Sequence, residues 1–179
     1  VDIGSNDGTS LGVYPPGKYS LLGIDPSGEK FMDHYPPGVK LVPDFFSGKI
    51  VNDAAQGKKA KVITSFSMFY DLEDPIAFAR EIEESLDDDG IWVCEQSYLP
   101  AMLMANSFDT ICHEHLEFYS LRQIDWIAEK AGLKVIDVKF NDINGGSFSI
   151  TAAKVDSAIQ PDLAQLEKIR ADELALGLN

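Results

Sequence analysis

The sequence predicts an α/β domain whose sheet is mostly parallel and ends in an antiparallel hairpin. Two observations support this fold class. Short apolar runs alternate with amphipathic segments through the first hundred residues, and an Asn-Gly-Gly turn separates two further apolar runs near the end. Strands that alternate with helices indicate βαβ units and a parallel sheet. Asn-Gly is typical of a hairpin turn, so the last two runs are expected to pair antiparallel.

Four apolar runs are the expected parallel strands, and they cover residues 19–24, 39–42, 61–64 and 90–94. The clearest helix between them covers residues 75–86. Its apolar residues Ile76, Ala79 and Ile82 repeat at helical spacing with acidic residues opposite. Pro75 suits the first turn of a helix because its missing N–H would be unpaired there in any case. The acidic residues 87–89 are expected to end this helix.

The later part of the chain changes pattern. A helix is expected over residues 122–131 and is closed by Gly132, and strands are expected over residues 133–140 and 147–153. Residues 1–155 form the predicted core domain. Residues 156–179 are expected to be a linker and a helix that leads to a further domain. The chain opens within an apolar strand without an initiator Met, so an upstream part is also expected.

The charge balance limits the partners of this chain. There are 15 Lys and Arg residues against 29 Asp and Glu residues, a net charge of −14. Such a surface repels phosphate backbones and anionic lipid, so neither nucleic acid nor membrane is an expected partner. No apolar run approaches the roughly 20 residues of a membrane span. The two cysteines, Cys94 and Cys112, lie far apart without metal-like spacing, which favours a reduced, cytoplasmic setting.

A glycine loop and the acid that follows it are the first candidate site. The loop, residues 2–8, lies between a strand end and a helix start, where Gly4 and Gly8 would let the backbone approach a ligand. Asp25 closes the next strand and can accept hydrogen bonds from both hydroxyls of a ribose. The alternative for Asp25 is a turn-forming role before Pro26. Together, loop and acid indicate a nucleotide-like ligand at the carboxyl edge of the sheet.

The acids around this loop predict the charge of the ligand. Asp2, Asp7 and Asp25 would repel a pyrophosphate and favour a cation. The loop also lacks the third glycine of the dinucleotide fingerprint and any Gly-Lys-Ser/Thr sequence. An adenosyl group that carries a sulfonium centre meets this demand. S-adenosylmethionine (SAM) is therefore favoured as the cofactor over NAD or ATP.

Beyond these physical arguments, the opening residues 1–11 and the Gly-Ile-Asp-Pro-Ser run at 23–27 resemble class I SAM-dependent methyltransferases, which have a Rossmann-like fold. Residues 42–47, 108–120, 144–148 and 171–178 resemble the sugar C-methyltransferase branch, which acts on nucleotide-linked deoxysugars. The resemblance covers nearly the whole chain, and His113-Glu114-His115 is its most specific part. It implies a small zinc-binding domain before the core and another α/β domain after it, both missing from this chain.

The same resemblance assigns the cofactor residues. It places Gly4, Asp7 and Gly8 along the methionine and ribose side, and Asp25 on the ribose hydroxyls. It also implies that the adenine is contacted by Pro26, Asp44 and Phe45. The reacting centre would be bordered by Ser65 and Phe66.

The His-Glu-His segment is the second candidate site. C-methylation beside a carbonyl requires a base for the α-proton and a group that stabilises the enolate, and histidine suits proton transfer near neutral pH. The resemblance implies Glu114 and His115 as catalytic residues, with His113 in support. Relatives often carry Tyr before this motif, where the chain has Cys112. Tyr70 is the candidate for a replacement hydroxyl.

Other interpretations of the segment stay open. His113 and His115 could supply two zinc ligands, but a usable site needs three or four, and only His34, Cys94 and Cys112 could add to them. No metal is therefore expected. A polar loop whose histidines bond to nearby carbonyls is the structural alternative.

The predicted function is methyl transfer from SAM to a small, nucleotide-sugar-like acceptor. Three alternatives remain at this point. The chain could transfer methyl to oxygen or nitrogen of another small molecule, it could be a non-catalytic SAM-binding module, or it could be an NAD-dependent oxidoreductase.

Overall fold

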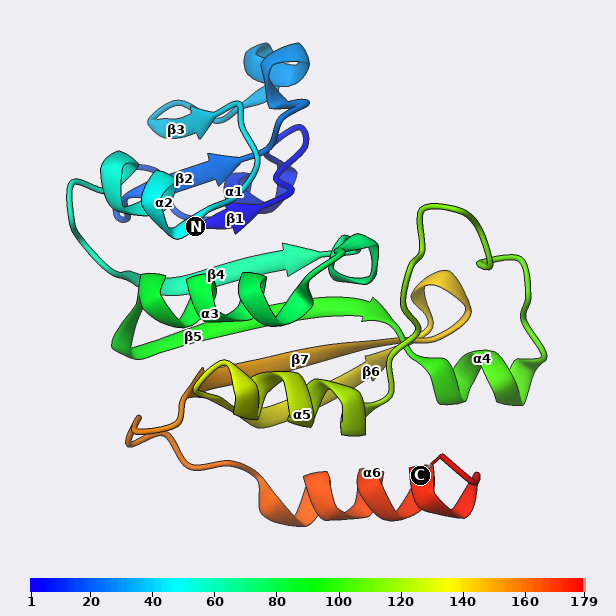
Figure 1. The fold of residues 1–179 in the computed structure, drawn as a ribbon. Coiled ribbons are helices and arrows are strands. Elements are labelled where there is room, and N and C mark those ends of the chain that lie inside the picture. Colours follow the sequence, from blue (N-terminus) through cyan, green and yellow to red (C-terminus); the bar gives the residue numbers. More distant parts are fainter. Residues whose placement is uncertain (179) are drawn as a thin grey trace.

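One seven-stranded sheet forms the centre of the computed structural model, which describes residues 1–178. The strand order is β3-β2-β1-β4-β5-β7-β6. Strands β1 to β5 run parallel to one another, and β7 runs antiparallel to both β5 and β6. The sequence prediction of a mostly parallel sheet with an antiparallel C-terminal hairpin is confirmed (Figure 1).

The strands have the following bounds: β1 Asp2–Ile3, β2 Leu21–Ile24, β3 Val39–Val42, β4 Ala60–Phe66, β5 Leu86–Ser97, β6 Leu133–Asn141 and β7 Ser147–Lys154. The register sets where the parallel strands end. Ile3 of β1 pairs with Ile24 of β2 on one side and with Ser65 of β4 on the other. The carboxyl ends of these three strands therefore lie at one level of the sheet.

The α-helices are α1 Thr9–Gly12, α2 Gly48–Ala54, α3 Pro75–Ser85, α4 Leu99–Ala105, α5 Leu121–Lys130 and α6 Leu163–Ala175. Three short 3-10 helices are η1 Gly28–His34, η2 Phe69–Asp71 and η3 Ile143–Gly145. Helices α3 and α5 lie side by side against the sheet, and α6 lies beyond α5 (Figure 1). Helix α4 and the long connection after it project from the carboxyl side of the sheet.

Local sequence explains how the two central helices begin and end. The Asp74 side chain caps α3 by accepting from the Ala77 N–H at 2.9 Å. Helix α5 begins with a capping box between Ser120 and Gln123, which pairs two otherwise free groups at the helix start. Gly132 follows α5 with φ +76°, a conformation that suits glycine because it has no Cβ. The expected helices at 75–86 and 122–131 are thus present within one residue at each end.

The sequence prediction was wrong at residues 87–89 and incomplete elsewhere. These acids were expected to end a helix, but β5 already begins at Leu86 and contains them. Lys61 forms ion pairs with both Asp87 and Asp89, which offsets the repulsion among the acids. Helices α2 and α4 were not predicted. They are only seven residues long, too short for a clear periodic pattern.

Helix α6 packs on the same core as the rest of the chain. Its Leu166 and Ile169 are buried, and Arg170 forms an ion pair with Asp125 of α5 at 2.7 Å. The main core lies between the sheet and α3 and α5. The helix expected beyond residue 155 therefore stabilises the predicted core domain directly. Within residues 1–178, no helix is long and apolar enough to cross a membrane.

Candidate functional site

The carboxyl edge of β1, β2 and β3 brings the predicted cofactor residues together. The Gly4 N–H donates to the Ile24 carbonyl at 2.9 Å, and the Asp25 N–H donates to the Val42 carbonyl at 3.2 Å. These bonds hold the glycine loop, Asp25 and the segment around Asp44 side by side. Sequence reasoning placed them at one sheet edge because parallel strands share their carboxyl ends.

Asp25 touches the glycine loop directly. Its Oδ2 accepts from the Asn6 N–H at 2.8 Å, and its Oδ1 accepts from the N–H and the hydroxyl of Ser27, both at 2.6 Å. A carboxylate has about four acceptor positions, so these three bonds leave one position free on Oδ2. Asp25 is only 8% exposed, so in this conformation it could accept from at most one ribose hydroxyl. A second hydroxyl would have to displace Ser27.

The two glycines of the loop have different surroundings. Gly4 has φ +71° and is exposed, so its backbone is open to a ligand. Gly8 has φ +76° and is buried, and a Cβ there would lie 3.0 Å from the Tyr35 ring. The Tyr35 hydroxyl donates to the Asn6 carbonyl at 2.9 Å and lies 2.8 Å from the Ser5 hydroxyl. Gly8 thus makes room for Tyr35, a residue that sequence reasoning missed because it belongs to no motif.

The other two loop acids differ in their environment. Asp2 is buried and accepts from the Thr64 hydroxyl, and burial raises its pKa although that hydrogen bond opposes the rise. Asp7 accepts from the Thr9 N–H at 3.0 Å, and hydrogen bonds from Thr9 lower its pKa. Asp2 therefore lies behind the loop rather than on its open side. Asp7 carries the charge that a cationic ligand would meet.

The residues predicted to contact adenine lie on the open side of this edge. Pro26 and Asp44 are exposed, and Phe45 is 75% exposed. The Phe45 N–H donates to Asp44 Oδ1 at 2.8 Å, which fixes the turn after β3. The exposed aromatic ring that follows β3 is available for stacking.

The two residues predicted at the end of β4 have different surroundings. Ser65 is fully buried, and its hydroxyl accepts from the Trp92 indole N–H at 2.9 Å. Its side chain therefore belongs to the core. Phe66, one residue later, is 38% exposed. A Cβ on Gly4 would lie 3.6 Å from the Met68 side chain, so the segment after β4 contacts the glycine loop.

The His-Glu-His segment lies in the connection between α4 and α5, where it is neither helix nor strand. His113 and Glu114 are exposed, and His115 is half-buried. The His115 and Tyr70 rings lie 4.3 Å apart, centroid to centroid. The Tyr70 carbonyl accepts from the Leu116 N–H at 3.0 Å, which ties the segment to η2. The structure thus brings together two residues that were assigned to the reaction separately.

The protonation of His115 follows from its hydrogen bond. Its Nδ1 lies 2.7 Å from the Thr110 carbonyl oxygen, which can only accept. Nδ1 therefore carries a proton, and in the neutral ring Nε2 is free to act as a base. Asp71 lies nearby: burial raises its pKa, while His115 lowers it and Glu114 raises it. Burial also raises the pKa of the Tyr70 hydroxyl, which keeps it protonated as a donor.

Residues 1–178 contain no group of three or more His, Cys, Asp or Glu side chains that could hold an ion. Cys94 is buried in β5, and burial raises its pKa to about 12.

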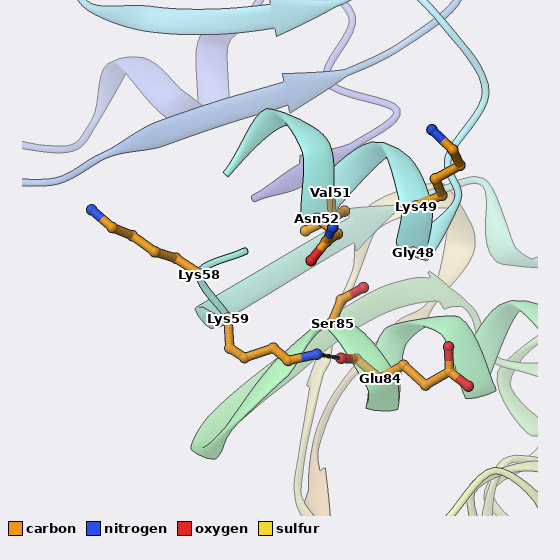
Figure 2. Close-up of a pocket in the computed structure, with 8 residues that line it drawn as sticks. All are labelled: Gly48, Lys49, Val51, Asn52, Lys58, Lys59, Glu84 and Ser85. Carbon is orange, nitrogen blue, oxygen red and sulfur yellow. Dashed lines mark hydrogen bonds between the residues drawn. The ribbon is translucent and has the colours of Figure 1, made fainter. Parts of the chain in front are cut away.

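Two cavities lie apart from these residues. One of about 270 Å³ is near the beginnings of β4 and β5, where Lys59 donates to the Glu84 carbonyl and Lys58 points away (Figure 2). The other, of about 690 Å³, lies between α4, the β6–β7 hairpin and α6. None of the predicted site residues lines either cavity. The candidate site is instead the open carboxyl edge of the sheet.

Comparison with known proteins identifies the family. A family model described as a methyltransferase domain matches residues 1–138. The chain belongs to this methyltransferase domain family. The C-methyltransferase NovU of Streptomyces niveus is 29% identical over 169 residues, which are 93% of this chain and 40% of NovU. The methyltransferase domain therefore spans less than half the length of that relative.

Solved structures share the fold of this methyltransferase domain. LepI in complex with SAM matches with a TM-score of 0.67 at 16% identity, over 86% of this chain and 42% of LepI. The O-methyltransferase NcsB1 of neocarzinostatin biosynthesis, solved with SAM, matches with a TM-score of 0.60 at 16% identity, over 86% and 47% of the two chains. These matches agree with the Rossmann-like methyltransferase fold expected from the sequence.

Proposed function

We propose that this methyltransferase domain binds SAM at the carboxyl edge of its sheet and directs base-assisted methylation of a carbon beside a carbonyl. The acceptor in this proposal is a small, nucleotide-sugar-like molecule. The observation that carries it is the direct contact between the glycine loop and Asp25. The segment after β4 contacts the same loop through Met68 and continues to Tyr70, which lies against His115. The similarity to NovU, a C-methyltransferase, supports carbon as the atom that is methylated.

The residues of the edge fit SAM. The open position on Asp25 Oδ2 would accept one ribose hydroxyl, and the exposed Phe45 ring would cover the adenine. SAM supplies an electrophilic methyl group on a positively charged sulfur. Asp7 and Asp25 place negative charge beside the open backbone of Gly4, which favours a cation there. The chain thus matches the donor in hydrogen bonding, stacking and charge.

The chemistry proposed for His115 and Tyr70 needs one base for the α-proton and one hydrogen-bond donor for the enolate. His115 Nε2 would take the α-proton, and the C–H electron pair would pass into the enolate. The bond from Nδ1–H to the Thr110 carbonyl keeps the ring oriented while it becomes positively charged. The carboxylates of Glu114 and Asp71 would stabilise that charge. The protonated Tyr70 hydroxyl would donate to the enolate oxygen.

Solvent exchange tests this assignment without needing the complete reaction. A nucleoside-diphosphate-linked keto-deoxysugar is incubated with the chain in D₂O, and deuterium at the α-carbon is followed by NMR. The proposal expects exchange with wild type and none with His115→Ala. Calorimetry should show SAM bound at a single site by both proteins. Exchange that survives in His115→Ala would contradict the proposed base.

O-methylation is the second candidate function. Cys112 stands where the resembling family often has a tyrosine, and it is exposed, so the chain departs from the C-methylating pattern at this position. A neutral His115 with a free Nε2 can also take a proton from a hydroxyl. Methyl transfer to a hydroxyl without any α-deuterium exchange would favour this candidate.

A further inference from the structure

Glu173 of α6 is a buried acid outside the site described above. The residue is 2% exposed. Oε1 accepts from the Tyr98 hydroxyl at 2.9 Å and from the Leu121 N–H at 2.6 Å, and Oε2 accepts from the Arg122 N–H at 3.2 Å. One carboxylate therefore joins three groups that are far from it in sequence.

The partners of Glu173 lie on the two sides of the segment that carries His115. Tyr98 directly precedes α4, and Leu121 is the first residue of α5. Residues 99–120 between them contain α4 and the His-Glu-His connection. The same two ends also meet through the backbone, where the Leu99 N–H donates to the Tyr119 carbonyl at 2.9 Å. Figure 1 shows the last turns of α6 beside the start of α5, on the side where α4 projects.

The Glu173 carboxylate lies at the start of helix α5. The first N–H groups of a helix have no partner inside the helix and carry partial positive charge, so a carboxylate there forms strong hydrogen bonds. The 690 Å³ cavity beside Tyr98 and α4 leaves these elements without close packing on that side. On its other side the Tyr98 ring packs against Phe140 and Phe148, 5.0 and 4.8 Å between ring centroids, and the hydrogen bond to Glu173 adds a polar restraint on its hydroxyl.

We propose that Glu173 is a positioning residue for the candidate reaction. By holding both ends of residues 99–120, it keeps His115 against Tyr70, about 4.3 Å between ring centroids. The reaction half of this inference rests on the function proposed above. The structural half, that Glu173 restrains residues 99–120, does not depend on it.

Three variants and a matched control separate this role from simple destabilisation. Glu173→Ala removes all three bonds. Glu173→Gln keeps one carbonyl oxygen for Tyr98 and Leu121 but turns an N–H toward Arg122. Tyr98→Phe removes one bond only. Asp172→Asn is the control, because Asp172 is the neighbouring acid on α6, is exposed and pairs with Lys168 at 2.6 Å. Leu166, Ile169 and the Arg170–Asp125 ion pair remain to hold α6 on the core.

Amide hydrogen exchange of residues 106–120 is the first measurement. We expect exchange to accelerate about tenfold or more in Glu173→Ala, less in Glu173→Gln and Tyr98→Phe, and not at all in Asp172→Asn. Should Glu173→Ala fail to fold, Glu173→Gln and Tyr98→Phe decide the matter. Unchanged exchange in the folded variants, or equal acceleration across the whole chain, would overturn the proposal.

Kinetics are the second measurement. We expect kcat to fall about tenfold in Glu173→Ala while the Kd for SAM is unchanged, with partial recovery in Glu173→Gln. A fall in kcat that is matched by loss of SAM binding would overturn the positioning role. If wild type itself transfers no methyl group, the proposed function fails, and the exchange data still decide whether Glu173 restrains residues 99–120.

Discussion

The two halves of the candidate site are held in place by different means. The cofactor half, residues 4–8 and Asp25, is held by the register of β1 and β2 and by short bonds within one sheet edge. The acceptor half lies on a long connection, and its His115 is held by Tyr70, by the Thr110 carbonyl and, through both ends of residues 99–120, by Glu173. The comparison teaches that donor binding and proton transfer should respond to different substitutions.

The largest expected effect concerns the acceptor half. His115→Ala should lower turnover on the order of 10²–10⁴-fold, because the proposed base is lost. The Kd for SAM should be unchanged, since the proposed role of His115 is toward the acceptor and not toward SAM. Steady-state kinetics and calorimetry on the same preparation measure both quantities. Exposed Ile111→Ala, in the same connection, is the matched control. Loss of SAM binding in His115→Ala would break the division between the two halves.

Asp25→Asn probes the cofactor half. The affinity for SAM should fall about 10- to 100-fold, because a charged acceptor of the ribose hydroxyl is replaced by a neutral amide that also meets the Asn6 or Ser27 N–H groups. Calorimetric titration checks this result. Exposed Asp44→Asn should have a smaller effect. Equal affinities for wild type and Asp25→Asn would remove Asp25 from the site.

Asp2→Asn should change stability rather than binding. Burial raises the pKa of Asp2, so the folded state disfavours its charged form. A raised carboxyl pKa means that wild type gains stability as the pH falls through the folded pKa and loses it again as the pH rises. Asp2→Asn should therefore be more stable than wild type at pH 7, with the difference shrinking toward the ordinary pKa of 3.8. Urea unfolding at several pH values measures this difference. A difference that grows on acidification would contradict the assigned cause.

Tyr35→Phe should give the smallest effect. It removes the hydroxyl that bonds Asn6 and Ser5 but keeps the ring over Gly8, so the free energy of unfolding should fall by about 0.5–1.5 kcal/mol. Chemical denaturation measures this change. SAM affinity should fall slightly, since the Asn6 carbonyl anchors the glycine loop. A fall in SAM affinity as large as that of Asp25→Asn would show that Tyr35 has a direct role in binding.

The sequence predicted that the glycine loop and Asp25 lie at one edge of the sheet, because local patterns dictate this geometry. Apolar runs gave the strands, and parallel strands necessarily bring Gly4 and Asp25 to one edge. It did not predict that Ser65 faces the core, since residues along a strand alternate between two faces and the mixed sequence around Ser65 does not tell which face is buried. Tyr35 and Glu173 were also missed. Their roles depend on contacts between distant segments, which no local pattern records.

A crystal structure of the chain with bound S-adenosylhomocysteine tests the central claim most directly. The account predicts that a ribose hydroxyl lies within hydrogen-bond distance of Asp25 Oδ2 and that the ligand sulfur lies on the side of the glycine loop that faces Tyr70 and His115. A ligand found in the cavity between α4 and α6, or one that leaves Asp25 bonded only to Asn6 and Ser27, would contradict it.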